Sequence, residues 1–205
     1  MSEMTLIERS VPLLFVFSGP SGVGKDTVIN ALKHQGVPMH FAVTMTTRPM
    51  RPGEKNGVDY YFVTPAEFRA AIERDELLEW AEVHGHLYGT PRTQVRRALA
   101  SGQDVMLKID VQGAAQVKQR VPEAVFIFLA PPSQEQLIER LRSRGTECGE
   151  VLQRRLANAR AEMARLPEYD YVVVNHEGRI DEAVYQVKAI ITAEKLRVRP
   201  RQITV

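Results

Sequence analysis

The segment from Gly19 to Thr27 contains three glycines followed by a lysine. An apolar run, Leu13 to Phe17, precedes it, and a helical pattern of apolar residues follows it. Such a loop lets backbone N–H groups converge where a helix begins, which is an arrangement that binds phosphate. Lys25 adds a cation suited to the outer phosphates of a nucleoside triphosphate. We therefore predict a phosphate-binding loop (P-loop) composed of Gly19, Pro20, Ser21, Gly22, Val23, Gly24, Lys25, Asp26 and Thr27.

Asp26 occupies the position at which this loop pattern usually has serine or threonine as a magnesium ligand. A carboxylate beside a triphosphate repels it unless a cation lies between them. We therefore expect Asp26 to hold Mg²⁺, directly or through its water shell. Thr27 is a poor substitute, because its side chain points about 100° away around the helix. The alternative is a structural role, in which Asp26 caps the helix or interacts with its dipole.

A second group of polar residues lies in a segment that prolines and glycines break into turns. Arg48 and Arg51 are three residues apart in this segment, and tyrosines follow at Tyr60 and Tyr61. Arginine presents paired donors that match the oxygens of a phosphate group. The segment therefore suits a bound phosphate, although two arginines in a polar loop would by themselves also fit a solvated surface.

Extended apolar runs alternate with helical patterns along the chain, which predicts an α/β fold with a parallel sheet covered on both faces. The expected central strands are Leu13 to Ser18, Val105 to Ile109, Val125 to Ala130 and Tyr171 to Asn175. Asp110 follows the second of these, at the strand end where parallel sheets bind ligands. Three roles remain open for it: contact with a ligand, support of the water shell of magnesium, or capping of the turn at Gln112 and Gly113.

Several helices have recognisable starts. Capping boxes are expected at Thr64 and at Ser133, where a glutamate or glutamine follows three residues later. Apolar periodicity predicts one longer helix after Glu150 and a closing helix from Ile180 to Leu196. The basic tail, residues 196–205, is expected to be solvated and frayed.

Composition limits the possible functions. A chain of 205 residues fits one compact domain with inserted subdomains. Its 27 lysines and arginines nearly balance 25 aspartates and glutamates, so no strong field favours nucleic acid or membrane as a partner. Met1 to Arg9 carries two glutamates and a serine, and no apolar run approaches membrane-spanning length. The single cysteine, Cys148, agrees with a reducing compartment. We expect a cytoplasmic location.

Six motifs occur in a fixed order along residues 11–195. They are GPSGVGK, the block T-x-T-T-R-P-x-R-x-G-E-x-x-G-x-D-Y-x-F from Thr44 to Phe62, E-W-A at Glu79 to Ala81, Y-G-T at Tyr88 to Thr90, I-D-V-Q-G at Ile109 to Gly113, and R-L-R-S-R-G at Arg140 to Gly145. This ordered set resembles the guanylate kinase family, whose members phosphorylate GMP with ATP. The resemblance implies a P-loop core (residues 11–43, 93–134 and 166–195), a GMP-binding subdomain (44–92) and a lid (135–165).

The resemblance also implies roles for particular residues. It implies that the GMP phosphate is bound by Arg48, Arg51, Tyr60 and Tyr88 and that guanine is bound by Thr44, Glu79, Thr90 and Asp110. It implies that ATP phosphates are reached by Lys25 and by the lid residues Arg140, Arg144 and Arg155, with Asn175 near adenine. ATP and Mg²⁺ are the expected phosphoryl donor and cofactor, GMP and dGMP the expected acceptors in purine nucleotide metabolism, and no obligate protein partner is expected.

Two alternatives belong to other classes. A ribose 1,5-bisphosphate kinase has a similar build and can also carry Lys-Asp in its loop, but it does not need the guanine-reading Glu79. A non-catalytic guanylate-kinase-like module binds proteins and typically loses the glycines and lysine of the loop. This chain also departs from the family pattern at Lys108, where family members often carry an acidic residue.

Overall fold

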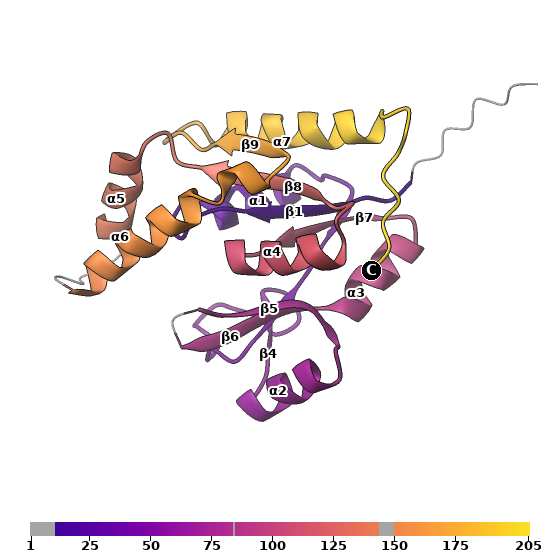
Figure 1. The fold of residues 1–205 in the computed structure, drawn as a ribbon, viewed down its shortest axis with the longest axis horizontal. Coiled ribbons are helices and arrows are strands. Elements are labelled where there is room, and N and C mark those ends of the chain that lie inside the picture. The colour runs from indigo at the N-terminus through magenta and orange to yellow at the C-terminus, as the bar shows by residue number, and fades with distance from the viewer. Residues whose placement is uncertain (1–10, 84, 144–149) are drawn as a thin grey trace, which may run out of the picture.

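The computed structural model describes residues 11–83, 85–143 and 150–205 (Figure 1). Its main sheet has the strand order β2-β7-β1-β8-β9, and every pair is parallel. The strands are β1 (Leu14–Ser18), β2 (Met39–Phe41), β7 (Asp104–Lys108), β8 (Val125–Ala130) and β9 (Tyr171–Val174). The expected α/β fold is confirmed. The four predicted strands are present with ends shifted by at most one residue, whereas the short strand β2 was not predicted.

Helices cover both faces of the main sheet (Figure 1). One face carries α1 (Lys25–His34) and α7 (Ile180–Lys195), and the other carries α3 (Arg92–Ala100) and α4 (Val111–Arg120). The side chains of β1 alternate between these layers, with Phe15 and Phe17 in the first and Leu14 and Val16 in the second. All of β1 is buried, as expected for a central parallel strand. Within the described residues, no helix is long and apolar enough to cross a membrane.

A second, smaller sheet has the order β4-β3-β6-β5. Its strands are β3 (Thr44–Thr46), β4 (Tyr60–Phe62), β5 (Leu77–Val83) and β6 (His86–Pro91), and α2 (Pro65–Glu73) packs on it through Phe68. The capping box predicted at Thr64 is confirmed, since Thr64 Oγ1 accepts a hydrogen bond from Glu67 N and the Glu67 carboxylate accepts one from Thr64 N. This small core gives the second sheet its own hydrophobic support.

Side-chain amides and one guanidinium join the second sheet to the core. Gln94 of α3 bonds both backbone groups of Val43, accepting at 2.9 Å and donating at 2.6 Å. Gln116 of α4 does the same with Trp80 of β5, at 3.1 and 2.5 Å. Arg120 donates to the carbonyls that precede Trp80 on the same strand. Strand β5 is therefore fastened along its outer edge to α4.

A helical arm follows β8 and lies at one end of the molecule (Figure 1). It consists of α5 (Gln134–Ser143) and α6 (Glu150–Met163), followed by the short helix η1 (Leu166–Glu168). The longer helix and the closing helix α7 agree with the predicted periodicity. The capping box at Ser133 is only half formed: Ser133 Oγ accepts from Gln136 N at 3.2 Å, but Gln136 Oε1 is buried without a hydrogen-bond partner.

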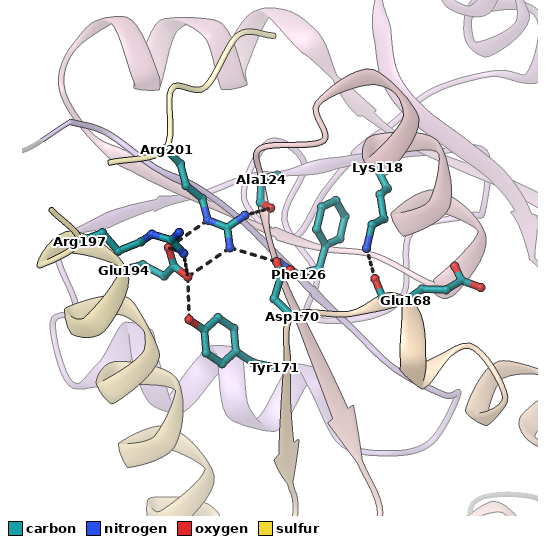
Figure 2. A network of polar contacts seen from close by, with 9 residues as sticks. All are labelled: Lys118, Ala124, Phe126, Glu168, Asp170, Tyr171, Glu194, Arg197 and Arg201. Carbon is teal, nitrogen blue, oxygen red and sulfur yellow. Dashed lines mark hydrogen bonds and ion pairs between the residues drawn. The ribbon is translucent and has the colours of Figure 1, made fainter. Parts of the chain in front are cut away.

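The expectation of a solvated, frayed C-terminal tail is wrong for its last residues. Figure 2 shows Arg201 donating to the carboxylate of Glu194, at 3.0 Å, and to the carbonyl of Ala124. The Glu194 side chain has no exposed surface and also accepts from the hydroxyl of Tyr171 at 2.6 Å. Ile203 packs against both main core layers. The sequence could not predict this arrangement, because the pattern of charged residues does not show that Glu194, 7 residues before Arg201, is buried.

We predict that Arg201→Ala lowers the free energy of unfolding by about 2–3 kcal/mol, because it leaves the buried carboxylate of Glu194 without its best-placed cation. Denaturant unfolding measures this change. The matched control is Arg199→Ala, at an exposed arginine two residues earlier, with an expected effect below about 0.5 kcal/mol. Equal effects of the two variants would contradict a structural role for the tail.

Candidate active site

The predicted P-loop connects β1 to α1. Gly24, at φ 102°, is the residue before the first turn of α1 and has no side chain with which to cap that turn. The first N–H groups of the helix point toward its N-terminus, as in any α-helix, and no side chain of residue 24 caps them. A side chain at position 24 would also collide with the amide of Asn175, 2.5 Å from the place of its Cβ. The loop thus needs glycine here for both conformation and space.

Lys25 lies inside this loop. Its ammonium donates to the carbonyls of Gly19, at 2.6 Å, and Pro20, at 3.0 Å. Burial lowers the pKa of Lys25, and the carboxylates of Glu162 and Asp26 oppose this effect. Glu162 comes from α6, and its Oε2 accepts a hydrogen bond from Ser21 N at 2.9 Å. The sequence did not predict this contact, because 141 residues separate its partners.

Asn175 and Arg140 hold the P-loop from the side. The buried amide of Asn175 donates to Val23 O at 2.8 Å. Arg140 donates to Asn175 O at 2.9 Å and to Val23 O at 3.3 Å. Both residues therefore lie at the loop, as predicted for donor-site residues, while their contacts with adenine and ATP phosphates remain predictions. Of the other two lid arginines, Arg144 lies outside the described residues, and the side chain of Arg155 is also outside the description.

Arg48 of the turn segment faces aromatic rings of the second sheet. Arg48 lies over the rings of Tyr60, 5.2 Å from the centroid, and Phe62, at 5.6 Å. Tyr60 and Tyr88 meet edge to face at 6.1 Å. A polar cavity of about 300 Å³ is lined by a set of residues that includes Arg48, Arg51, Tyr60 and Tyr88. The structure therefore brings together all four residues expected at the acceptor phosphate.

Glu54 orients this cluster. One of its oxygens pairs with the Arg48 guanidinium at 2.7 Å, and the other accepts from the backbone N–H of Arg51 at 2.8 Å. The pairing with Glu54 raises the pKa of Arg48, and hydrogen bonds from Arg48 and Arg51 lower the pKa of Glu54. The sequence motif contained Glu54, but no role was predicted for it. The sequence did contain a signal for this role, because Glu54 follows Arg51 by three residues within a turn.

A second cavity, of about 170 Å³, adjoins the first and is lined by three of the four residues expected to bind guanine, while the fourth, Thr90, is buried and does not line it. Its lining includes Thr44, Glu79 and Asp110, together with Tyr60 and Tyr88, which it shares with the polar cavity. Glu79 is 3% exposed, and its Oε1 accepts from the hydroxyl of Thr90 at 2.6 Å. Burial raises the pKa of Glu79 to about 7, the Thr90 hydrogen bond opposes the rise, and the charge of Asp110 adds to it. A buried carboxylate with few partners is suited to receive donors from a ligand.

Asp110 has a structural contact as well. Its Oδ1 accepts from Gly113 N at 2.8 Å and so caps α4. A Cβ at position 113 would overlap the carboxylate of Glu79. Glycine at this position therefore allows the carboxylates of Glu79 and Asp110 both to approach the first turn of α4. The capping role left open for Asp110 is therefore confirmed. Contact with guanine or magnesium remains a prediction.

Asp26 and Lys108 form an ion pair at the junction of the two cavities. Asp26 is in the first turn of α1, and its side chain is 74% exposed. No group of three or more His, Cys, Asp or Glu side chains within the described residues is arranged to hold a metal by itself. Magnesium is usually bound through one or two carboxylates together with substrate phosphates. The carboxylate of Asp26, next to Lys25, fits that mode.

The fold and site define a class of protein. A P-loop at the carboxyl edge of a parallel sheet, facing a cavity with arginines that suit a second phosphate, is typical of P-loop kinases that act on small phosphorylated substrates.

Comparison with known proteins identifies the family. The guanylate kinase family model matches residues 12–194. The chain is 50% identical to the guanylate kinase of Desulfitobacterium hafniense over 193 residues, which are 94% of this chain and 96% of that protein. It is 50% identical to guanylate kinase 2, chloroplastic/mitochondrial, of Oryza sativa over 95% of this chain and 68% of that protein. The crystal structure of the guanylate kinase from Anaplasma phagocytophilum aligns with a TM-score of 0.75 at 36% identity, covering 92% of this chain and 88% of that one. The chain belongs to the guanylate kinase family.

The raised pKa of Glu79 leads to a prediction about stability without nucleotide. Between the ordinary value of 4.5 and about 7, the unfolded chain releases this proton while the folded protein keeps it. Glu79 therefore destabilises the fold increasingly as pH rises through this interval, by a total on the order of 3 kcal/mol. We expect Glu79→Gln to be more stable than the wild type at pH 8 and about equally stable at pH 4.5.

Thermal and denaturant unfolding across this pH range measure the effect. Glu82→Gln is the matched control, because Glu82 lies on the same strand with an exposed side chain. A difference between Glu79→Gln and the wild type that does not change with pH would show that the carboxylate of Glu79 ionises normally.

Proposed function

We propose that this protein transfers the γ-phosphoryl group of ATP to GMP, and to dGMP, forming the corresponding diphosphate. The observation that carries the assignment is the buried carboxylate of Glu79 in a cavity that adjoins both the P-loop and the arginine cluster. Membership of the guanylate kinase family supports the same reaction.

Glu79 accounts for the choice of base. Guanine presents N1–H and an exocyclic amino group along one edge, and an ionised carboxylate offers two acceptor oxygens at a matching separation. Adenine has an unprotonated N1 at that place, which faces the oxygen lone pairs and makes no bond. The Thr90 hydroxyl fixes one oxygen of Glu79. Discrimination by a hydrogen bond that the wrong substrate cannot make is a strong selective device.

The remaining chemistry is positioning and charge neutralisation. Phosphoryl transfer requires two phosphates held in line, with the charge on the moving group stabilised. The backbone N–H groups of the loop and Lys25 bind the donor phosphates, and Arg48 and Arg51 bind the acceptor phosphate. Arg140 adds positive charge from the helical arm. Arg144 and Arg155 are proposed to act with it because of the family resemblance. The acceptor is already a phosphate oxyanion, so no side chain has to remove a proton from it.

Magnesium belongs to the same proposal. Asp26 would hold the ion together with phosphate oxygens and water, and the bound ion would neutralise charge on the triphosphate. The domain roles, with residues 44–92 binding GMP and 135–165 closing over ATP, and a cytoplasmic location complete the proposal. A protein-binding module without catalysis is disfavoured, since the loop glycines and Lys25 are retained.

An acceptor panel tests the function. With ATP and Mg²⁺, we predict phosphorylation of GMP and dGMP in strong preference to AMP, UMP and ribose 1,5-bisphosphate. Glu79→Gln replaces one acceptor oxygen with a donor that faces guanine, so it should lose about 1.5–3 kcal/mol of GMP recognition, measured as kcat/KM, with little change in the KM for ATP. Preference for ribose 1,5-bisphosphate, or a Glu79→Gln variant within twofold of wild type for GMP, would overturn the assignment.

A magnesium titration tests Asp26. We predict that Asp26→Asn raises the Mg²⁺ concentration needed for half-maximal rate, because the variant loses an anionic oxygen ligand. Binding of metal-free ATP should be unchanged or tighter, because a negative charge beside the triphosphate is removed. Superimposable magnesium curves together with a lowered melting temperature would instead make Asp26 a structural residue of the helix end.

A further inference from the structure

The position of Lys108 follows from the pairing of the strands. In the parallel pair β1 and β7, Lys108 is the partner of Phe17, two residues from the start of the P-loop at Gly19. Met106 and Phe17 belong to the core layer formed with α1 and α7. Because side chains alternate along a strand, Lys108 points to the same side as Met106. Its ammonium therefore emerges beside the first turn of α1.

Two neighbours hold the ammonium there. It pairs with Asp26 Oδ1, and it lies 5.6 Å from the centroid of the Tyr60 ring. Burial lowers the pKa of Lys108, but the charge of Asp26 and the interaction with Tyr60 outweigh burial and raise it. The Lys108 side chain is 27% exposed, so its charge is partly shielded from solvent but is not buried in the core.

This ammonium lies where the polar cavity and the base-binding cavity adjoin. Lys108 lines the polar cavity that contains Arg48 and Arg51, and it also lines the adjoining cavity that contains Lys25 and Glu79. Nothing in the family pattern or in the site already described requires a lysine here. A cation at this junction is placed to contact a phosphate group in the polar cavity.

We propose that Lys108 binds the phosphate group of the acceptor nucleotide, with Asp26 and Tyr60 orienting its ammonium. This inference rests on the proposed function and adds a phosphate-binding residue to it. The competing explanation is that Lys108 only neutralises Asp26. In that case its removal would weaken phosphate binding indirectly, through repulsion from the carboxylate of Asp26, which Lys108 would no longer neutralise.

Binding without ATP and magnesium separates these explanations. Calorimetry with GMP and with guanosine, which lacks the phosphate, is compared for the wild type, Lys108→Met, Lys108→Arg and the double variant Asp26→Asn with Lys108→Met. We expect Lys108→Met to weaken GMP binding by about tenfold, equivalent to about 1.4 kcal/mol, with guanosine binding within about twofold of wild type. Lys108→Arg should recover part of the loss, and the double variant should remain weak.

Lys33→Met is the matched control, since Lys33 also lines the polar cavity but lies over the ring of Phe41. Its GMP affinity should stay within about twofold of wild type. The proposal is overturned if Lys108→Met binds GMP as wild type does, if the double variant regains wild-type affinity, or if Lys33→Met shows an equal loss. A wild type that binds neither GMP nor guanosine would instead refute the proposed function itself.

Discussion

The parallel pairing of β1 with its neighbours is the constraint on which the site depends. It brings the end of β1, where the P-loop starts, beside the end of β7, which is followed by Ile109 and Asp110. Because both strands are buried on both faces, a shift of register would move apolar residues out of two core layers at once. The core therefore fixes where the polar groups emerge. Lys25 of the P-loop therefore meets Lys108 and Asp110, at the end of β7, at one edge of the sheet, although the P-loop and the end of β7 lie far apart in the chain.

Charge is kept inside the site at a cost to the fold. Glu79 is buried and Lys25 is partly buried. Burial lowers the pKa of Lys25 and raises that of Glu79, so it favours the neutral form of each group. In water these groups would be well solvated, but they would also discriminate weakly between ligands. The protein instead surrounds them with fixed partners, such as the loop carbonyls on Lys25 and the hydroxyl of Thr90 on Glu79. Such preorganised groups need little rearrangement when substrate binds.

Local signals in the sequence predicted much of this molecule. The P-loop is contiguous, so its glycines and lysine predicted both the strand before it and the helix after it. The turn segment with Arg48 and Arg51, and the order of motifs around Glu79 and Asp110, led to residues that the structure brings into two adjoining cavities. The contacts that were missed join residues far apart in the chain, as Glu162 does with Ser21 and Lys108 with Asp26. The tail was misjudged for the same reason, because its basic composition does not reveal the buried Glu194.

The attachment of β5 to α4 has a consequence for the behaviour of the protein at high concentration. Strand β5 is an edge of the second sheet, and an open edge can pair with the strand of another molecule and start aggregation. Gln116 occupies both backbone groups of Trp80 on that edge, and Arg120 occupies the carbonyls of Leu77 and Leu78. The same contacts that hold Glu79 in place thus block a template for intermolecular strand pairing, so the residues of α4 protect solubility as well as the geometry of the base-binding pocket.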